Sequence, residues 1–228
     1  MNINCRPMRI YLKLTPNTEV VPFNYQRAMV GAFHKWLGEN ELHDDISLYS
    51  LSWLYGGKMR RDKKGYDFRN GAEFFISSPL EGLHRSAVSG LFKDEMIQWG
   101  MRVEEVRMRT TPYFGERQRF IAQSPIFIKK RREEDYGQKF VFPGDEDADI
   151  LMTATLQKKL ERAGLDYKAS VAFDPEYQNP KTKKITFNKI DLIGTFCPVI
   201  VEGDPEAVRF AWDVGVGHST GIGFGALR

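Results

Sequence analysis

Cysteine is scarce in this chain of 228 residues, which contains only Cys5 and Cys197. Two cysteines this far apart, with no second pair, support neither a disulfide framework nor a zinc site. The sequence also lacks an apolar run long enough to cross a bilayer, and no signal-peptide pattern opens it. We therefore expect a protein with no metal and no membrane partner, working in a reducing cytoplasm.

An excess of charge of one sign is missing too, because 33 basic residues oppose 30 acidic ones and leave a formal net charge of +3. The overall balance therefore says little about nucleic acid. The basic residues are nevertheless clustered, at residues 58–64 (KMRRDKK), 129–132 (KKRR) and 181–184 (KTKK). Such clusters attract phosphate even on a nearly neutral protein, although solvated loop charge explains any single cluster more simply.

The first half of the chain predicts the order strand, helix, strand, strand, helix, strand, which is the ferredoxin-like pattern. The expected strands cover residues 8–15, 47–55, 72–77 and 100–110. A helix over residues 25–37 carries apolar residues on one face, with Asn24 as its cap and Gly38 as its end. A second helix follows Ser78 and Pro79, and Glu81 completes a predicted capping box.

The second half repeats this order less cleanly, and we see no sequence repeat between the halves. Expected strands cover residues 119–130 (interrupted by Pro125), 167–174, 182–188, 190–201 and 222–228, and expected helices follow the acidic residues 145–149 and open at Asp204 and Pro205. We therefore expect an α+β protein with two tandem ferredoxin-like domains, residues 1–114 and 115–228. The boundary should lie near residues 111–118, where Thr111, Pro112 and Gly115 break the pattern.

Residues 215–225 (GVGHSTGIGFG) contain five glycines and join a predicted helix to a predicted last strand. Glycine permits positive φ and close approach of another backbone, and successive N–H groups in such a turn bind phosphate. The spacing is not that of a P-loop, since no Gly-Lys-Ser/Thr follows, and a Rossmann loop runs from strand to helix instead. These residues alone leave two interpretations, a packing loop and a phosphate-binding loop.

Histidine is rare as well, and its four copies are His34, His43, His84 and His218. A histidine near its ordinary pKa moves protons in RNA cleavage, which needs a base for the 2′-hydroxyl and an acid for the leaving 5′-oxygen. His34 and His43 are the candidates, although a lone histidine is more often structural or exposed. We expect His84 on the surface of its helix. The acidic residues 145–149 favour a helix N-terminus over a cation site.

Three segments together resemble the CRISPR-associated endoribonucleases of the RAMP superfamily, which process repeat RNA. Residues 21–26 (VPFNYQ) are similar to the Val-Pro-aromatic-Asn turn that opens the first helix in that family. Residues 120–125 (FIAQSP) resemble a Ser-Pro strand at the start of the family's second domain. Residues 215–225 look like its C-terminal glycine-rich signature, the most specific match. The resemblance covers nearly the whole chain.

The resemblance implies two RAMP-like domains and an enzyme that cleaves CRISPR repeat RNA (pre-crRNA) by 2′-hydroxyl attack. The products carry a 2′,3′-cyclic phosphate and a 5′-hydroxyl, and neither a metal nor another cofactor takes part. His43 matches the family's usual catalytic histidine, and His34 falls where some members place a tyrosine or a second histidine. Ser47 stands in the register of a catalytic lysine that some members carry, so this lysine is missing, and Lys58 is the candidate replacement.

The resemblance also implies where RNA binds. The expected RNA-binding residues are Gly215, Gly217, His218, Ser219, Gly221 and Gly223 of the glycine-rich stretch and Lys129, Lys130 and Arg131 of the second basic cluster. The expected partner is the CRISPR repeat RNA, with other CRISPR effector subunits as further candidates. A monomer and a homodimer both stay open.

Two other functions remain. Because the lysine is missing, the chain is alternatively a non-catalytic RAMP subunit that binds CRISPR RNA in an effector complex, and it would then leave bound repeat RNA intact. An unrelated enzyme whose glycine loop binds a nucleotide cofactor is the third possibility. No recognised phosphate-loop spacing supports it, and saturable binding of ATP or NAD without RNA binding would be its mark.

Overall fold

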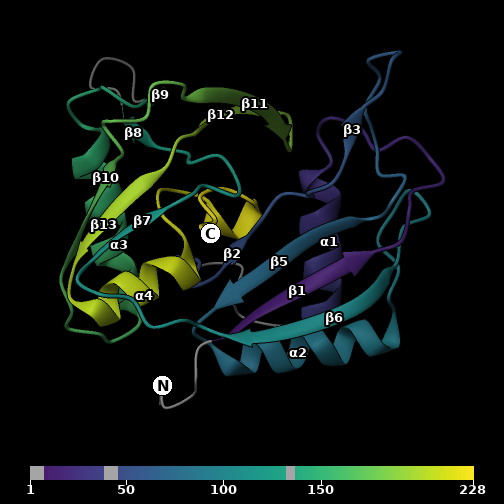
Figure 1. Ribbon diagram of the computed structural model, residues 1–228, viewed down its shortest axis with the longest axis horizontal. Coiled ribbons are helices and arrows are strands. Elements are labelled where there is room, and N and C mark those ends of the chain that lie inside the picture. The colour runs from purple at the N-terminus through teal and green to yellow at the C-terminus, as the bar shows by residue number, and fades with distance from the viewer. Residues whose placement is uncertain (1–7, 39–45, 132–136) are drawn as a thin grey trace.

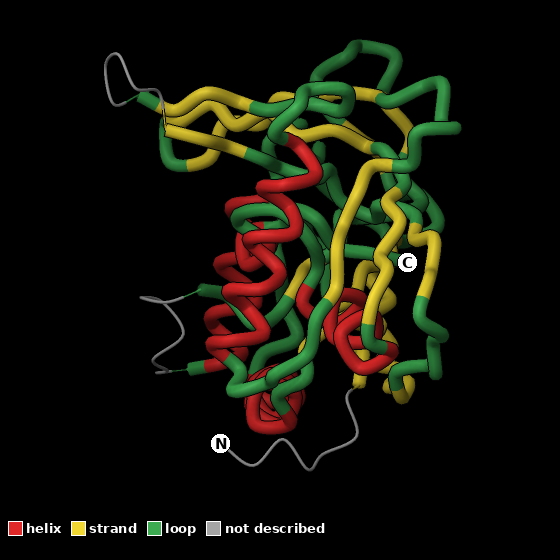
Figure 2. The backbone as a smooth tube through the Cα atoms, turned by 90° about the vertical axis from the view of Figure 1, so that its left-hand side faces the viewer, coloured by secondary structure: helices red, strands yellow, loops and turns green. Residues whose placement is uncertain are grey.

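The computed structural model describes residues 8–38, 46–131 and 137–228. Two α+β units lie side by side, the first half of the chain in one and the second half in the other (Figure 1). Helices gather mainly on one side of the molecule and most strands on the other (Figure 2). In the described part of the chain, no helix is long and apolar enough to cross a membrane.

The N-terminal half has the ferredoxin-like topology that its sequence predicts. Its sheet has the order β2-β5-β1-β6, and all pairs in it are antiparallel. The elements are β1 (Met8–Leu14), α1 (Gln26–Leu37), β2 (Ser50–Leu51), β5 (Ala72–Ser78), α2 (Glu81–Lys93) and β6 (Val103–Thr110). Ile10, Leu12 and Leu14 alternate along β1 and are fully buried, because successive side chains of a strand point to opposite faces. A short hairpin, β3 (Lys58–Met59) and β4 (Tyr66–Asp67), is inserted before β5.

The C-terminal half repeats this topology with one irregular strand. Its elements are β7 (Arg117–Phe120), β8 (Lys129–Arg131), β9 (Gln138–Phe140), α3 (Ala148–Arg162), β10 (Ala169–Phe173), β11 (Lys181–Phe187), β12 (Ile190–Phe196), β13 (Val199–Gly203), α4 (Pro205–Val214) and η1 (Thr220–Ile222). The sheet order is β10-β13-β7. The last residues take the place of a fourth strand, since Ile121 and Arg228 exchange backbone hydrogen bonds at 2.8 Å. We propose that the domain boundary lies between β6 and β7.

A buried polar network joins the two halves. The guanidinium of Arg9 is sandwiched between the rings of Phe75 and Trp212, at 3.8 and 3.2 Å from their centroids. It donates to the backbone oxygen of Trp212 at 2.8 Å, and the hydroxyl of Thr111 donates to the Asp213 carboxylate at 2.8 Å. Because Arg9 is on β1 and Asp213 on α4, these contacts fix how the halves are placed.

Several local predictions were wrong, mainly at the ends of elements. Tyr25, not Asn24, is the N-cap residue of α1, and the Asn24 side chain instead accepts a hydrogen bond from Thr186. The capping box of α2 is absent, because the Ser78 hydroxyl bonds to Leu80 and Leu48 ahead of the helix. The expected strand 47–55 is reduced to β2, and residues 222–228 form no regular strand.

Histidine 84 also differs from its prediction. The side chain is 2% exposed instead of lying on the surface. Burial lowers the pKa of His84 to about 4, so the ring is neutral at neutral pH.

Candidate functional site

The glycine-rich residues 215–225, called the glycine segment below, follow α4 and form a tight double turn. Gly215, Gly217, Gly223 and Gly225 all have positive φ, between 61° and 92°. Ser219 shares this left-handed conformation, with φ of 59°. A Cβ on Gly217 would lie 2.7 Å from the backbone oxygen of Phe127, so both the conformation and the close approach require glycine.

Most of the glycine segment is buried. Within it, only His218, Ser219 and Ile222 are partly exposed. Gly215 therefore fits the packing interpretation, because a Cβ at this position would lie too close to the carbonyl oxygen of Gly225. A ligand can reach the segment only at the turn formed by His218 and Ser219 and at Ile222.

A buried lysine anchors the segment from α3. Lys159 is 2% exposed, and its ammonium donates to the backbone oxygens of Val214 and Gly215 at 3.0 and 3.2 Å. It also donates to the hydroxyl of Thr220 at 3.0 Å. Burial lowers the pKa of Lys159 to about 7. Because the last carbonyls of a helix carry partial negative charge, the C-terminus of α4 stabilises this cation.

The other side of the segment lies against the N-terminal half. η1 contacts both α1 and β2. A side chain on Gly221 would meet Ser47 and lie 2.8 Å from the hydroxyl of Tyr49. Ser47, the residue in the register of the missing lysine, therefore lies directly beside the glycine segment.

The structure describes only one of the two candidate histidines. His34 is in the last turn of α1, the helix that contacts η1, and is partly buried. His43 lies outside the described residues. Among the described residues that follow it, Ser47 lies beside the glycine segment.

His218 is held at the exposed turn by its own backbone. Its N–H donates to the carbonyl of Phe127 at 2.7 Å, and its ring contacts the Phe127 ring edge-on. Burial, followed by the charges of Lys129 and Lys159, lowers the pKa of His218 to about 4. The imidazole is therefore neutral at neutral pH and offers hydrogen bonds instead of a charge.

Lys129, Lys130 and Arg131 form the strand β8. Lys130 makes an ion pair with Asp147, so its charge is partly compensated. The acidic residues stand at a helix N-terminus as predicted, because Asp147 is the N-cap residue of α3 and Asp149 lies in its first turn. Asp147 makes no side-chain cap hydrogen bond, and Asp149 accepts one from the backbone of Phe173 at 2.9 Å. Among the described residues, no three His, Cys, Asp or Glu side chains are grouped as metal ligands.

Lys58 does not lie beside His34. It is exposed on β3 and lines a pocket together with Tyr25, which precedes the first turn of α1. His34 is nine residues further along the helix, and at 1.5 Å per residue the two ends are roughly 14 Å apart along the axis. The charge of Lys58 therefore lies towards the opposite end of α1 from His34.

Two residues that sequence reasoning missed hold this site together, Lys159 and Trp53. Lys159 could have been found, because Met152, Leu156 and Leu160 form the apolar stripe of α3 and position 159 falls within that stripe. The indole of Trp53 donates to the backbone oxygen of Gly223 at 2.6 Å. No sequence signal pointed to this contact, since it depends on how the halves pack.

Comparison with known proteins finds a matching family and a similar protein over nearly the whole chain. Residues 108–228, more than half of the chain, match the family described as CRISPR associated protein Cas6, C-terminal. The chain is 26% identical over 237 aligned positions to the CRISPR-associated endoribonuclease Cas6 1 of Methanocaldococcus jannaschii, with 96% of this chain and 92% of the relative covered.

Solved structures show the same fold. A Cas6-related protein from Pyrococcus furiosus superposes with a TM-score of 0.85 at 19% identity, covering 97% of this chain and 98% of that one. A structure described as a RAMP protein binding different RNA substrates has a TM-score of 0.84 at 20% identity, with the same coverage. Both likenesses support two tandem ferredoxin-like domains.

Proposed function

The chain belongs to the CRISPR-associated Cas6 family, and from this premise we propose that it is an endoribonuclease that cleaves CRISPR repeat RNA. The observation that supports this most is the position of the glycine segment. Its turn η1 contacts α1, which carries His34, and its Gly221 lies beside Ser47, four residues after His43 in the sequence.

The reaction that fits these residues is attack by the 2′-hydroxyl on the adjacent phosphorus. One histidine takes the proton of the 2′-hydroxyl as the 2′-oxygen bonds to phosphorus. The other gives a proton to the 5′-oxygen as its bond to phosphorus breaks. The products carry a 2′,3′-cyclic phosphate and a 5′-hydroxyl, and the two histidines accept and supply the protons that move, so the proposed reaction uses no metal. We assign these two roles to His43 and His34.

The turn at His218 and Ser219 is the proposed phosphate contact. Its left-handed backbone at Ser219 and the neutral His218 ring offer hydrogen bonds to phosphate oxygens. Lys129, whose charge acts on His218, supplies positive charge beside it. Gly215, Gly217, Gly221 and Gly223 then serve RNA binding indirectly, by allowing the turn to form.

The experiment is incubation of the protein with its cognate repeat RNA in EDTA. We expect one cut within each repeat, and we expect His43→Ala and His34→Ala each to slow cleavage by roughly a hundredfold or more, as the loss of a general acid or base does. Arg85→Ala, an exposed change on α2, is the control. A requirement for divalent metal, or cleavage by the double histidine variant at the wild-type rate, would refute the mechanism.

The second candidate function is a subunit that binds CRISPR RNA without cutting it. Ser47 favours it, because this residue lies beside Gly221 and supplies no cation for the developing phosphate charge. Tight binding of repeat RNA that is still intact after long incubation would establish this alternative. Both functions share the proposed phosphate contact, so only the cleavage measurement separates them.

A further inference from the structure

A pocket of about 340 Å³ opens beside the start of α1, at the opposite end of that helix from His34. Five aromatic rings and one lysine line it, from Tyr25, Trp53, Tyr55, Tyr66, Phe68 and Lys58. We propose that this aromatic pocket binds one unpaired base of the RNA. The proposal rests on the proposed function and adds to it a base-binding site away from the cleavage chemistry.

The rings are fixed by contacts that leave the pocket open. Trp53 meets the rings of Tyr25 and Phe196 edge-on, with centroids 6.1 and 5.4 Å away. The Tyr25 hydroxyl accepts a hydrogen bond from the backbone of Leu54 at 3.2 Å, and the Trp53 indole is bonded to Gly223. Since the polar atoms of these rings already have protein partners, what they offer a ligand is aromatic surface.

Tyr55 is the ring that a ligand reaches first. Its side chain is 64% exposed, whereas Tyr25 is 4% exposed. Trp53 and Tyr66 are partly exposed between these extremes. Stacking on such rings accepts any base, because every base has a π-face. The gradient of exposure suits an unstacked base that enters past Tyr55.

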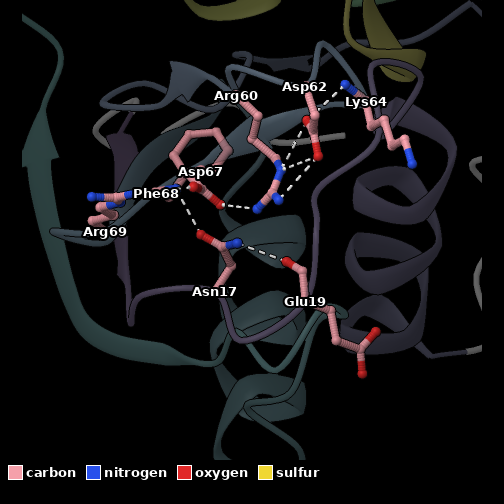
Figure 3. A network of polar contacts seen from close by, with 8 residues as sticks. All are labelled: Asn17, Glu19, Arg60, Asp62, Lys64, Asp67, Phe68 and Arg69. Carbon is pink, nitrogen blue, oxygen red and sulfur yellow. Dashed lines mark hydrogen bonds and ion pairs between the residues drawn. The ribbon is translucent and has the colours of Figure 1, made fainter.

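The wall formed by Phe68 is held in place by its neighbours. The backbone N–H of Phe68 donates to the Asn17 side chain at 2.6 Å, and Arg60 bonds to Asp62 and Asp67 on the same hairpin (Figure 3). A Cβ on Gly57 would lie 2.6 Å from Cζ of Phe68. Glycine at position 57 therefore lets the backbone approach the ring closely.

Positive charge surrounds the pocket on two sides. Residues 58–69, which contain β3 and β4, carry six basic and two acidic side chains. Lys183 of β11 reaches the hydroxyl of Tyr66 at 3.5 Å, and β11 is itself rich in lysine. None of the described residues that line the pocket is acidic. Aromatic rings within a basic surround are the features of a site for single-stranded nucleic acid.

The pocket is also connected to the proposed phosphate contact. Trp53 lines the pocket and bonds to Gly223, which lies four residues after Ser219 in the glycine segment. An RNA strand whose phosphate lies at Ser219 can thus continue towards the pocket. A peptide side chain would need no such basic surround, and this favours RNA as the occupant.

The test uses repeat RNA blocked against cleavage by a 2′-deoxy substitution and carrying a single 2-aminopurine at each unpaired position in turn. Stacking on an aromatic ring quenches this base, so we expect one position to be quenched by the wild-type protein. Tyr55→Ala should remove that quenching and weaken binding roughly five- to a hundredfold, the range for losing one stacked base. Tyr55→Phe should keep both, and Tyr113→Ala, at a tyrosine 84% exposed outside the pocket, is the matched control.

The salt dependence of RNA affinity distinguishes the contribution of the Tyr55 ring from that of the Lys58 charge. Lys58→Ala should reduce the slope of log affinity against log salt by about 0.7, as expected for one lost phosphate contact on a single strand. Tyr55→Ala should leave this slope unchanged while lowering affinity. If Tyr55→Ala instead lowers the slope, the tyrosine acts on backbone contacts and the base-binding assignment is overturned.

The remaining outcomes are distinct. Quenching that persists in Tyr55→Ala, or an equal loss in Tyr113→Ala, overturns the pocket. A proline-rich decapeptide serves as the probe for a peptide occupant. If Tyr55→Ala weakens binding of this peptide but leaves RNA binding unchanged, the pocket binds peptide and the proposal is overturned. Cleavage of unblocked repeat RNA in EDTA is measured in parallel. If the wild type cleaves and no base responds to Tyr55, only the pocket is wrong, whereas a wild type that neither binds nor cleaves repeat RNA refutes the proposed function itself.

Discussion

The ammonium nitrogen of Lys159 lies 3.0 Å from the hydroxyl oxygen of Thr220, and that hydroxyl donates to the backbone oxygen of Tyr49 at 2.9 Å. Lys159 belongs to α3 in the C-terminal half, and Tyr49 immediately precedes β2 in the N-terminal half. Two successive hydrogen bonds thus connect the halves through the glycine segment. The position of the proposed phosphate contact depends on both.

Lys159→Met should change how stability depends on pH. Burial lowers the pKa of Lys159 from 10.5 to about 7. Between these values the unfolded chain binds more protons than the folded one, so this group makes the free energy of unfolding rise with pH. Methionine removes that contribution. The stability of the wild type relative to the variant should therefore increase from pH 7 to pH 10, measured by urea unfolding.

The neighbouring Lys158 is exposed and supplies the control. Lys158→Met should leave the pH dependence of the wild type in place. A stability difference between wild type and Lys159→Met that is constant across this range would show that Lys159 titrates normally.

Thr220→Val should loosen the glycine segment while keeping the shape of the side chain. The change leaves the Lys159 ammonium short of an acceptor and the Tyr49 carbonyl short of a donor, and an unsatisfied buried group costs about 1–3 kcal/mol. Each kcal/mol lowers the melting temperature of a chain of this size by roughly 2–4 °C. Thr220→Ser keeps the hydroxyl and should recover most of the loss in a thermal melt. If Thr220→Ser melts at a temperature as low as Thr220→Val, losing the hydroxyl costs no more than losing the methyl group, and this expectation is contradicted.

Asp213→Asn should reveal a contribution to stability whose pH dependence has the opposite sign to that of Lys159. Burial raises the pKa of Asp213 from 3.8 to about 7, although hydrogen bonding from Thr111 and the charges of Arg9 and Arg209 oppose the rise. The folded chain therefore binds more protons than the unfolded one between these values, and this contribution to stability is lost as pH rises towards 7.

The stability of the wild type relative to Asp213→Asn should accordingly fall from pH 4 to pH 7, measured as the difference in urea midpoints. Asp166 has a fully exposed side chain, so Asp166→Asn is the comparison. A difference that grows with pH in this window would mean that Asp213 is ionised in the folded protein at low pH, paired with Arg9.

The sequence was most informative where structure is set locally. The apolar stripe of α3 and the glycine at the end of α1 predicted those elements, because helix periodicity and a left-handed end residue depend on nearby residues alone. Tandem ferredoxin-like topology followed from the order of such elements, although the last strand is irregular.

Features decided by packing between distant segments were not predictable in the same way. His84 is buried although its helix position suggested the surface, and Asn24 bonds across the molecule to Thr186 instead of capping α1. At the candidate site, the composition of the glycine segment did not reveal that most of it is buried, and its role in RNA binding stays a prediction. The role of Lys58 stays a prediction, and sequence distance alone could not show that its hairpin lies towards the end of α1 opposite His34.

Gly217→Ala tests whether the left-handed turn is required for RNA binding. Gly217 has φ of 74°, and a Cβ would lie 2.7 Å from the Phe127 carbonyl oxygen. The backbone conformation alone costs alanine about 1–2 kcal/mol, and relief of the clash must move either the glycine segment or the backbone at Phe127. We expect lower stability and also weaker binding of repeat RNA, measured by fluorescence anisotropy at a temperature where the variant is fully folded.

Gly115→Ala is the matched change, because nothing lies within 4 Å of its Cβ position and its φ is not positive. It should leave stability and RNA affinity close to those of the wild type. If Gly217→Ala lowers stability but binds repeat RNA as tightly as Gly115→Ala does, the glycine segment serves packing alone. RNA phosphate would then have to be bound elsewhere, with the β8 residues Lys129 and Arg131 as the next candidates.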